Sequence, residues 1–376
     1  MFYLGTFIFF ISFFRISFIH PYFYLVFFPA VIGFFYFFGR KDFWRIERDS
    51  VFLIFFFIIL SFYSLVLDVF QSGLSFESSF LFRLFTIVFF SFFPAYFLNL
   101  FIIKCRDDYF DKIVKYAFIV QIFFFFLMYL NPQSKPLFYS LIGLGGSVNL
   151  NSQNLLTRGF GLSGEINFMT PFMMVYLTFL IYRRNIFLKI IIFFTQIINS
   201  NMALLAAVVG FLITKTNLSL KIFFVGLMVV FYYFIGEKII KEKMPRVYDE
   251  YIVGGGTRTV DGLLSNHIFS LGELNPITIL FGFQKNISSS VDDSNIYSDM
   301  GWVIMFNYGG VFLIFLVLMV IFLLSMRIFS NKFYALIWFF VGMILNTKGM
   351  IIGMNGYFFL SFLLLLSQRY NKLSRK

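Results

Sequence analysis

Long runs of apolar residues, separated by short polar segments, make up most of the chain. A transmembrane helix needs roughly 20 predominantly apolar residues, and most of these runs reach or approach that length. The runs lie near residues 2–19, 22–38, 51–67, 80–103, 113–130, 166–182, 186–199, 202–214, 222–236, 301–325, 333–347 and 355–367. The pattern predicts an all-α polytopic membrane protein with about 12 transmembrane helices, and ten to twelve is the range because several runs are short.

Composition supports the same class of protein. Of the 376 residues, 60% are hydrophobic and 13% are charged, and the mean hydropathy is +0.86. A soluble domain is about half apolar and a quarter charged. The single Cys105 excludes a disulfide framework, and two histidines, His20 and His267, make a metal centre unexpected. The first apolar run continues through Pro21 without a small-residue cleavage site, so we expect no cleavable signal peptide.

The basic residues follow the predicted topology. With a cytoplasmic N-terminus, 17 Lys and Arg residues fall in predicted cytoplasmic segments and 3 in the short outer segments. The cytoplasmic segments are 39–50, 104–112, 183–185, 215–221, 327–332 and 368–376. By the positive-inside rule both termini are then cytoplasmic. The net charge of +12 is a topology signal that suits an anionic inner leaflet, and nucleic acid is not an expected partner.

The polar residues outside the membrane gather in two segments, 131–165 and 237–300, while the other outer connections are tight turns. We therefore expect a single transmembrane domain, 1–376, that works on its outer face. Matched internal repeats, which many transporters carry, are not evident in the sequence.

The first candidate element is segment 158–167, which reads RGFGLSGEIN. Its three glycines allow the backbone to approach an anion closely, and Arg158 offers a planar fork of donors for phosphate or sugar hydroxyls. Glu165 and Asn167 open the next helix. A glycine-rich turn in which Glu165 and Asn167 only cap that helix remains an open alternative.

The second outer segment repeats this combination of glycine, arginine and acid. Arg258 lies in GGGTRTVDG, residues 254–262, beside three consecutive glycines. Asp299 and Asn295 lie in SNIYSDMGW, residues 294–302, directly before an apolar run. We take Arg258 and Asn295 as candidate substrate-binding residues, whereas Asp299 is either a catalytic carboxylate or a helix cap.

Two arginines fall inside apolar runs, each near the predicted outer end. An arginine within a membrane span is costly and suggests a function, although a side chain that snorkels to lipid phosphates is an equally weighted alternative for Arg15 and Arg83. If the functional interpretation holds, Arg15, Arg83, Arg158 and Arg258 all lie on the outer side. Such a set of cations suits a pyrophosphate.

The order of these motifs resembles the O-antigen polymerase (Wzy-type) family. The family turn, R-x-x-G-L-x-G-E-x-N, is matched here by Arg158, Gly161, Leu162, Gly164, Glu165 and Asn167. A short hairpin that contains Ser-Arg in the family is similar to residues 198–207, INSNMALLAA, where Met202 replaces the arginine. In the family the large outer loop ends in P-x-x-x-x-F-G-x-G, followed by S-D-x-G and a helix that contains glycine. This pattern is matched here in part, by Pro276, Phe281, Gly282, Phe283, Ser298, Asp299, Gly301, Gly309 and Gly310.

The resemblance implies a GT-C-like glycosyltransferase with two larger periplasmic loops in the bacterial inner membrane, active on the periplasmic face. Its substrate would be an undecaprenyl-pyrophosphate-linked oligosaccharide. Membrane lipids would surround the enzyme, and a chain-length regulator is a candidate partner. It implies no metal and no other cofactor. Glu165 and Asp299 are then the candidate catalytic bases, and Glu165 is preferred because its segment matches better. The four arginines, Asn167 and Asn295 would bind substrate.

Two other functions remain open. An O-antigen ligase would share this fold, but by resemblance it carries a histidine followed by asparagine near the end of the large loop, where this chain reads DDSNIYSDMGW. The second is a lipid-linked oligosaccharide flippase or other transporter, which should have charges in mid-span and internal repeats. The apolar runs of this chain keep their charges near their ends, and no repeats are evident.

Overall fold

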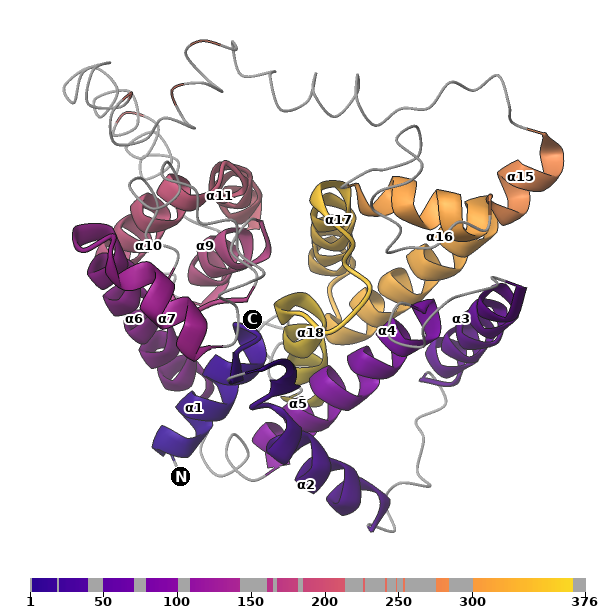
Figure 1. Cartoon of the computed structure of the whole chain (residues 1–376), viewed down its shortest axis with the longest axis horizontal. Coiled ribbons are helices and arrows are strands. Elements are labelled where there is room, and N and C mark those ends of the chain that lie inside the picture. Colours follow the sequence, from indigo (N-terminus) through magenta and orange to yellow (C-terminus); the bar gives the residue numbers. More distant parts are fainter. Residues whose placement is uncertain are drawn as a thin grey trace. The chain divides into compact units, whose positions relative to one another are not determined.

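The computed structural model describes two compact groups of helices (Figure 1). The described residues are 2–18, 20–39, 50–70, 79–100, 109–142, 161–164, 168–181, 185–213, 275–283 and 300–367, with single residues at 226, 241, 248 and 253. The first unit comprises Met1–Val26 and Arg106–Asp261, and the second comprises Phe27–Cys105 and Gly262–Lys376. The expected single domain over 1–376, with outer loops 131–165 and 237–300, stays a prediction.

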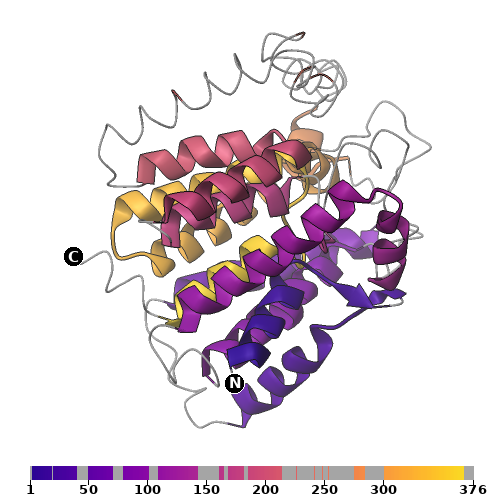
Figure 2. The same cartoon turned by 90° about the vertical axis from the view of Figure 1, so that its left-hand side faces the viewer.

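The first unit is centred on helix α9 (Met169–Ile181), in which every residue from Met169 to Leu180 is buried. A helix that is apolar on all sides belongs in an interior, and α10 and α11 pack against it (Figure 2). The other helices of this unit are α1 (Phe2–Phe13), α6 (Tyr109–Leu130), α7 (Ser134–Leu141), α10 (Ile186–Asn199) and α11 (Met202–Ile213). Helix α1 packs against α6.

The second unit is built around the long helix α16 (Gly301–Ile328), which contacts α3, α15, α17 and α18. The other elements are α2 (Phe27–Phe38), α3 (Ser50–Phe70), α4 (Phe80–Ile87), a π-helical turn η3 (Val88–Phe92), α5 (Phe93–Leu98), α15 (Pro276–Phe281), α17 (Lys332–Lys348) and α18 (Gly356–Ser367). Elements α4, η3 and α5 form one continuous helix. Its π turn ends two residues before Pro94, which has no backbone N–H and clashes with the preceding turn of a regular helix.

Helices occupy each of the predicted apolar runs except 222–236, which lies almost wholly outside the described residues. Among the described residues, four helices are long and apolar enough to cross a membrane: Val51–Val69, Phe80–Leu98, Tyr109–Leu130 and Gly301–Ile328. The remaining apolar helices are shorter. On α3 the side chains of Phe55, Ile58 and Phe62 are exposed, and their spacing places them on one face suited to lipid. The prediction of a helical, membrane-embedded protein is therefore confirmed.

The N-terminal helix is shorter than its apolar run. The run 2–19 predicts one helix, but α1 ends at Phe13 and the chain continues into two antiparallel strands, β1 (Ser17–Phe18) and β2 (His20–Tyr24). The cause is a left-handed residue, Arg15, with φ 52°. The N–H of Ile16 donates to the carbonyl of Ile11 at 3.1 Å, which is the hydrogen bond of a Schellman motif. The run 22–38 likewise begins as strand and becomes helical only at Phe27.

Candidate functional site

The segment 161–164, the described part of RGFGLSGEIN, is bound to the end of α1. The N–H of Gly164 donates to the carbonyl oxygen of Phe14 at 2.9 Å, and the Ser163 hydroxyl donates to the same oxygen at 3.4 Å. Phe14 directly follows α1, at the helix end where backbone acceptors are left unsatisfied. A Cβ on Gly164 would lie 2.6 Å from the carbonyl oxygen of Arg15. Only glycine permits this approach.

The other end of the same segment rests on α6 and α7. Gly161 has φ 71°, and a Cβ there would clash with the buried side chain of Gln121 on α6. The hydroxyl of Tyr139 on α7 donates to the Gly161 carbonyl at 3.2 Å. Burial raises the pKa of Tyr139 well above its usual range. The phenol therefore stays protonated and keeps its hydrogen bond at physiological pH.

A third attachment joins the segment to α9. The hydroxyls of Ser163 and Thr170 lie 2.7 Å apart and both are buried. We call Phe14, Gln121, Tyr139, Thr170 and segment 161–164 the turn cluster. Four helices, α1, α6, α7 and α9, thus fix the backbone of a segment that the sequence presents as a flexible glycine-rich turn.

The turn cluster places Arg15 beside the predicted motif. Its backbone contacts Gly164, and its side chain is half-buried. A left-handed conformation costs a non-glycine residue about 1–2 kcal/mol, and glycine is the usual residue at this position of a Schellman motif. An arginine that persists under such strain is a candidate for function. The site role of Arg15 and its snorkelling to lipid phosphates both stay predictions.

A second group of polar residues lies in the second unit, at the start of α4. The carboxylate of Asp68 accepts hydrogen bonds from the N–H groups of Phe80 at 3.4 Å and Leu81 at 3.2 Å, and from the hydroxyl of Tyr308 on α16. We call these four residues the Asp68 cluster. A carboxylate at a helix N-terminus satisfies unpaired donors and complements the helix dipole.

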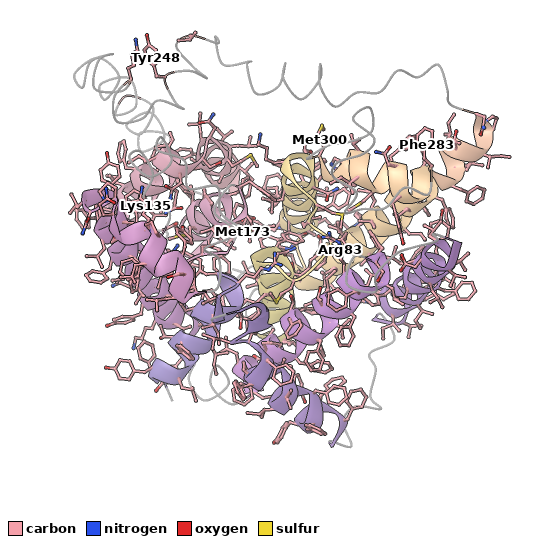
Figure 3. The ribbon with its side chains drawn as sticks, in the orientation of Figure 1. Arg83, Lys135, Met173, Tyr248, Phe283 and Met300 are labelled. Carbon is pink, nitrogen blue, oxygen red and sulfur yellow. The ribbon has the colours of Figure 1, made fainter. Side chains whose placement is uncertain are left out.

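Arg83 lies one turn further along α4, half-buried (Figure 3). The Ser79 hydroxyl caps the same helix by accepting from the N–H of Phe82 at 3.0 Å. The helix that carries Arg83 is therefore fixed at its start by two caps. Arg83 belongs to the second unit and Arg15 to the first.

Helix α16 is broken at Gly310, which has φ 68° and ψ −167°. The hydroxyl of Tyr63 on α3 donates to the carbonyl of Gly309 at 2.9 Å. The end of α15 packs into the break: the N–H of Phe283 donates to the carbonyl of Asn307 at 2.9 Å, and a Cβ on Gly310 would clash with the carbonyl of Leu280. The kink has identifiable hydrogen-bond partners on both sides.

The glycines of the second motif therefore have packing reasons of their own. Gly282 has φ 75° and ends α15 against α16, where a Cβ would lie 2.6 Å from the Phe306 carbonyl oxygen. A Cβ on Gly301 would clash with Asn346 on α17. Pro276 occupies the first turn of α15, behind the reciprocal cap formed by Asn275 and Thr278. These positions are explained by close helix packing without any contact to substrate.

Of the predicted site residues, Arg15 and Arg83 are described, and the structure brings Arg15 to the turn. Six lie outside the described residues: Arg158, Glu165, Asn167, Arg258, Asn295 and Asp299. Their roles stay predictions. Glu165 directly follows Gly164 in the chain, so the anchored segment leads into it.

Two charged residues of note were missed in the sequence. Asp68 is the only charged residue of α3, and an ionisable residue at the end of an apolar run is a signal that could have identified it. Lys135 on α7, which Figure 3 labels, is 0% exposed, a rare state for a lysine. The sequence offers no sign of its burial, since Lys135 lies in a mixed polar segment between apolar runs.

Within the described ranges, no group of three or more His, Cys, Asp or Glu side chains could hold a metal ion. Comparison of the chain with protein-family models, curated proteins and solved structures finds no match. The functional argument therefore rests on the motifs and on the geometry around them.

Proposed function

We propose that the protein is an O-antigen polymerase of the bacterial inner membrane. It has about 12 transmembrane helices in a GT-C-like arrangement, cytoplasmic termini, and periplasmic loops at 131–165 and 237–300. It joins undecaprenyl-pyrophosphate-linked oligosaccharide units by transferring the growing chain to a new repeat unit. The observation that supports the proposal is the anchoring of segment 161–164, the described part of RGFGLSGEIN, beside the strained Arg15, since this brings a cation to the strongest family motif.

The proposed reaction is a substitution at the anomeric carbon of the growing chain. A hydroxyl oxygen of the new unit forms a bond to that carbon, the bond from the carbon to the pyrophosphate oxygen breaks, and undecaprenyl pyrophosphate leaves with the bonding electrons. The hydroxyl proton passes to a carboxylate, Glu165 or Asp299. Glu165 is preferred because it follows the anchored segment directly.

Arginines stabilise the leaving group in this proposal. Negative charge grows on the pyrophosphate in the transition state, and donors already in position lower the barrier most. The backbone of Arg15 contacts Gly164 of the glycine-rich turn, and Arg158 begins that turn in the sequence. The further candidates for binding pyrophosphate are Arg258 and Arg83. The fork of the guanidinium matches two phosphate oxygens at once, which a lysine does not. Asn167 and Asn295 bind sugar hydroxyls.

The test is deletion of the gene in its host, followed by electrophoresis of lipopolysaccharide. A polymerase predicts loss of the ladder and persistence of a band with core plus one repeat. Loss of every O-antigen band, with lipid-linked polymer accumulating, would indicate a ligase instead. Accumulation of the lipid-linked unit facing the cytoplasm would indicate a flippase.

A further inference from the structure

The end of α10 and its turn to α11 carry three carboxamide side chains within six residues, Gln196, Asn199 and Asn201. Gln196 and Asn199 are each 1% exposed. They are three residues apart on α10 and so share one face of the helix. That face is the buried one, since Leu188, Ile192 and Thr195 lie along it as well. We call these three side chains the amide turn.

The amide turn is short of hydrogen-bond partners. The side-chain oxygens of all three residues are buried, and no donor among the described residues reaches any of them. The Gln196 amide nitrogen donates one long hydrogen bond, to the Thr195 hydroxyl at 3.4 Å. Buried polar groups are normally satisfied, because an unmade hydrogen bond destabilises the fold. Three such oxygens in one turn therefore need a reason.

Helix capping does not supply that reason. The N-terminus of α11 is capped by Ser200, whose hydroxyl accepts from the N–H of Met202 at 3.3 Å. Backbone carbonyls of Ser200 and Asn201 accept from Ala203 at 3.1 Å and Leu204 at 3.0 Å. These bonds satisfy the N–H groups at the start of α11 without using any of the three carboxamide side chains.

The amide turn lies at the same end of its helix group as the turn cluster. Helices α9, α10 and α11 follow one another through short connections and pack together (Figure 2). The end of α10 and the start of α11 therefore lie at the end where α9 begins. The chain enters α9 from segment 161–164, and Thr170 in the first turn of α9 bonds to Ser163.

The chemistry of the amide turn suits an uncharged, hydroxyl-rich ligand. A carboxamide offers an acceptor and two donors, which is the set needed to bind neighbouring hydroxyls of a sugar ring. Residues 190–213 contain no charged side chain, and Met202 stands at the start of α11. The buried cation on this face of α10, Lys189, lies seven residues before Gln196, about two turns away, so a phosphate would find no cation within the amide turn itself.

We propose that the amide turn is a carbohydrate subsite, in which Gln196, Asn199 and Asn201 bind the hydroxyls of repeat-unit sugars. This inference rests on the proposed polymerase function and identifies where that enzyme holds the uncharged part of its substrate. In the unliganded protein the unsatisfied amide oxygens lower stability, because the site is formed before the sugar binds.

Stability and activity should respond in opposite directions to apolar replacements. Gln196→Met and Asn199→Leu keep the side-chain size and remove unsatisfied groups, so the thermal midpoint of the purified protein should equal or exceed that of wild type. Addition of repeats should fall about 10-fold per amide, as a lost hydrogen bond to substrate predicts. The matched control is Asn355→Leu. Its amide donates to the carbonyl of Gly353 at 3.2 Å and accepts from the N–H of Phe358 at 3.0 Å, so its loss should lower the midpoint.

A binding measurement separates this inference from the proposed function. The probe is the oligosaccharide released by mild acid from the lipid-linked intermediates of the same cells, with dextran as the control. It should raise the thermal midpoint of the wild-type protein and not that of Gln196→Met. If deletion of the gene leaves the ladder intact, the polymerase proposal fails. The subsite is then supported if the oligosaccharide raises the thermal midpoint of wild type and not that of Gln196→Met, and it is wrong if both midpoints respond alike. If deletion removes the ladder but both variants keep full elongation and the full shift, the subsite is wrong and the polymerase stands.

Discussion

At the scale of single residues, Arg15 combines backbone strain with a position beside the glycine-rich turn. Arg15→Gly removes the left-handed penalty, so it should raise the free energy of unfolding by about 1 kcal/mol once the entropy of glycine is allowed for. The same change removes a guanidinium proposed to bind pyrophosphate, so the glycan chains should shorten. Thermal unfolding in detergent and lipopolysaccharide gels measure the two effects. Normal chain lengths in this variant would reduce Arg15 to a lipid-facing cation.

Arg158 gives the companion prediction for the turn itself. Arg158→Ala should abolish long glycan chains and leave products with a single repeat, because the leaving pyrophosphate loses its fork of donors. Lipopolysaccharide electrophoresis with quantified membrane protein is the measurement. Arg83→Lys is the comparison: a lysine also snorkels, so full activity there would assign Arg83 to lipid contact. A normal ladder in Arg158→Ala would remove Arg158 from the mechanism.

At the scale of elements, the Asp68 cluster is expected to hold α4 in place. Asp68→Ala leaves two helix N–H groups and the hydroxyl of Tyr308 without their shared acceptor, so the free energy of unfolding should fall by about 2 kcal/mol. Asp68→Asn keeps an acceptor oxygen and should lose less. Thermal unfolding of the purified variants compares them, and equal midpoints for wild type and Asp68→Ala would show that the cluster is not needed for stability.

The broken helix α16 supplies a second prediction at this scale. Gly310→Ala places a methyl group against the Leu280 carbonyl in a left-handed conformation, so we expect a loss of about 2–4 kcal/mol or a displaced α15. Gly226→Ala is the matched control, because nothing lies within 4 Å of an added Cβ there. The comparison is made by thermal unfolding. Similar midpoints for the two variants would contradict the packing of α15 into the kink.

At the scale of the whole molecule, apolar run length was enough to locate most helices and the membrane class. It could not locate the end of α1, which depends on the backbone conformation of Arg15, or the π turn before Pro94. The link from Phe14 to segment 161–164 was also beyond the sequence, since a backbone carbonyl and a glycine N–H leave no side-chain pattern. The glycines of both motifs were recognised, but their packing partners Gln121, Leu280 and Asn346 were not.

The proposed polymerase activity is tested most directly by reconstitution. Purified protein in liposomes is supplied with the lipid-linked repeat units that accumulate in the deletion strain, and the glycan products are separated by size. We predict a ladder of lipid-linked chains, with one undecaprenyl pyrophosphate released for each bond formed, that Arg158→Ala does not produce. Folded wild-type protein that leaves the repeat units at their original size would contradict the proposal.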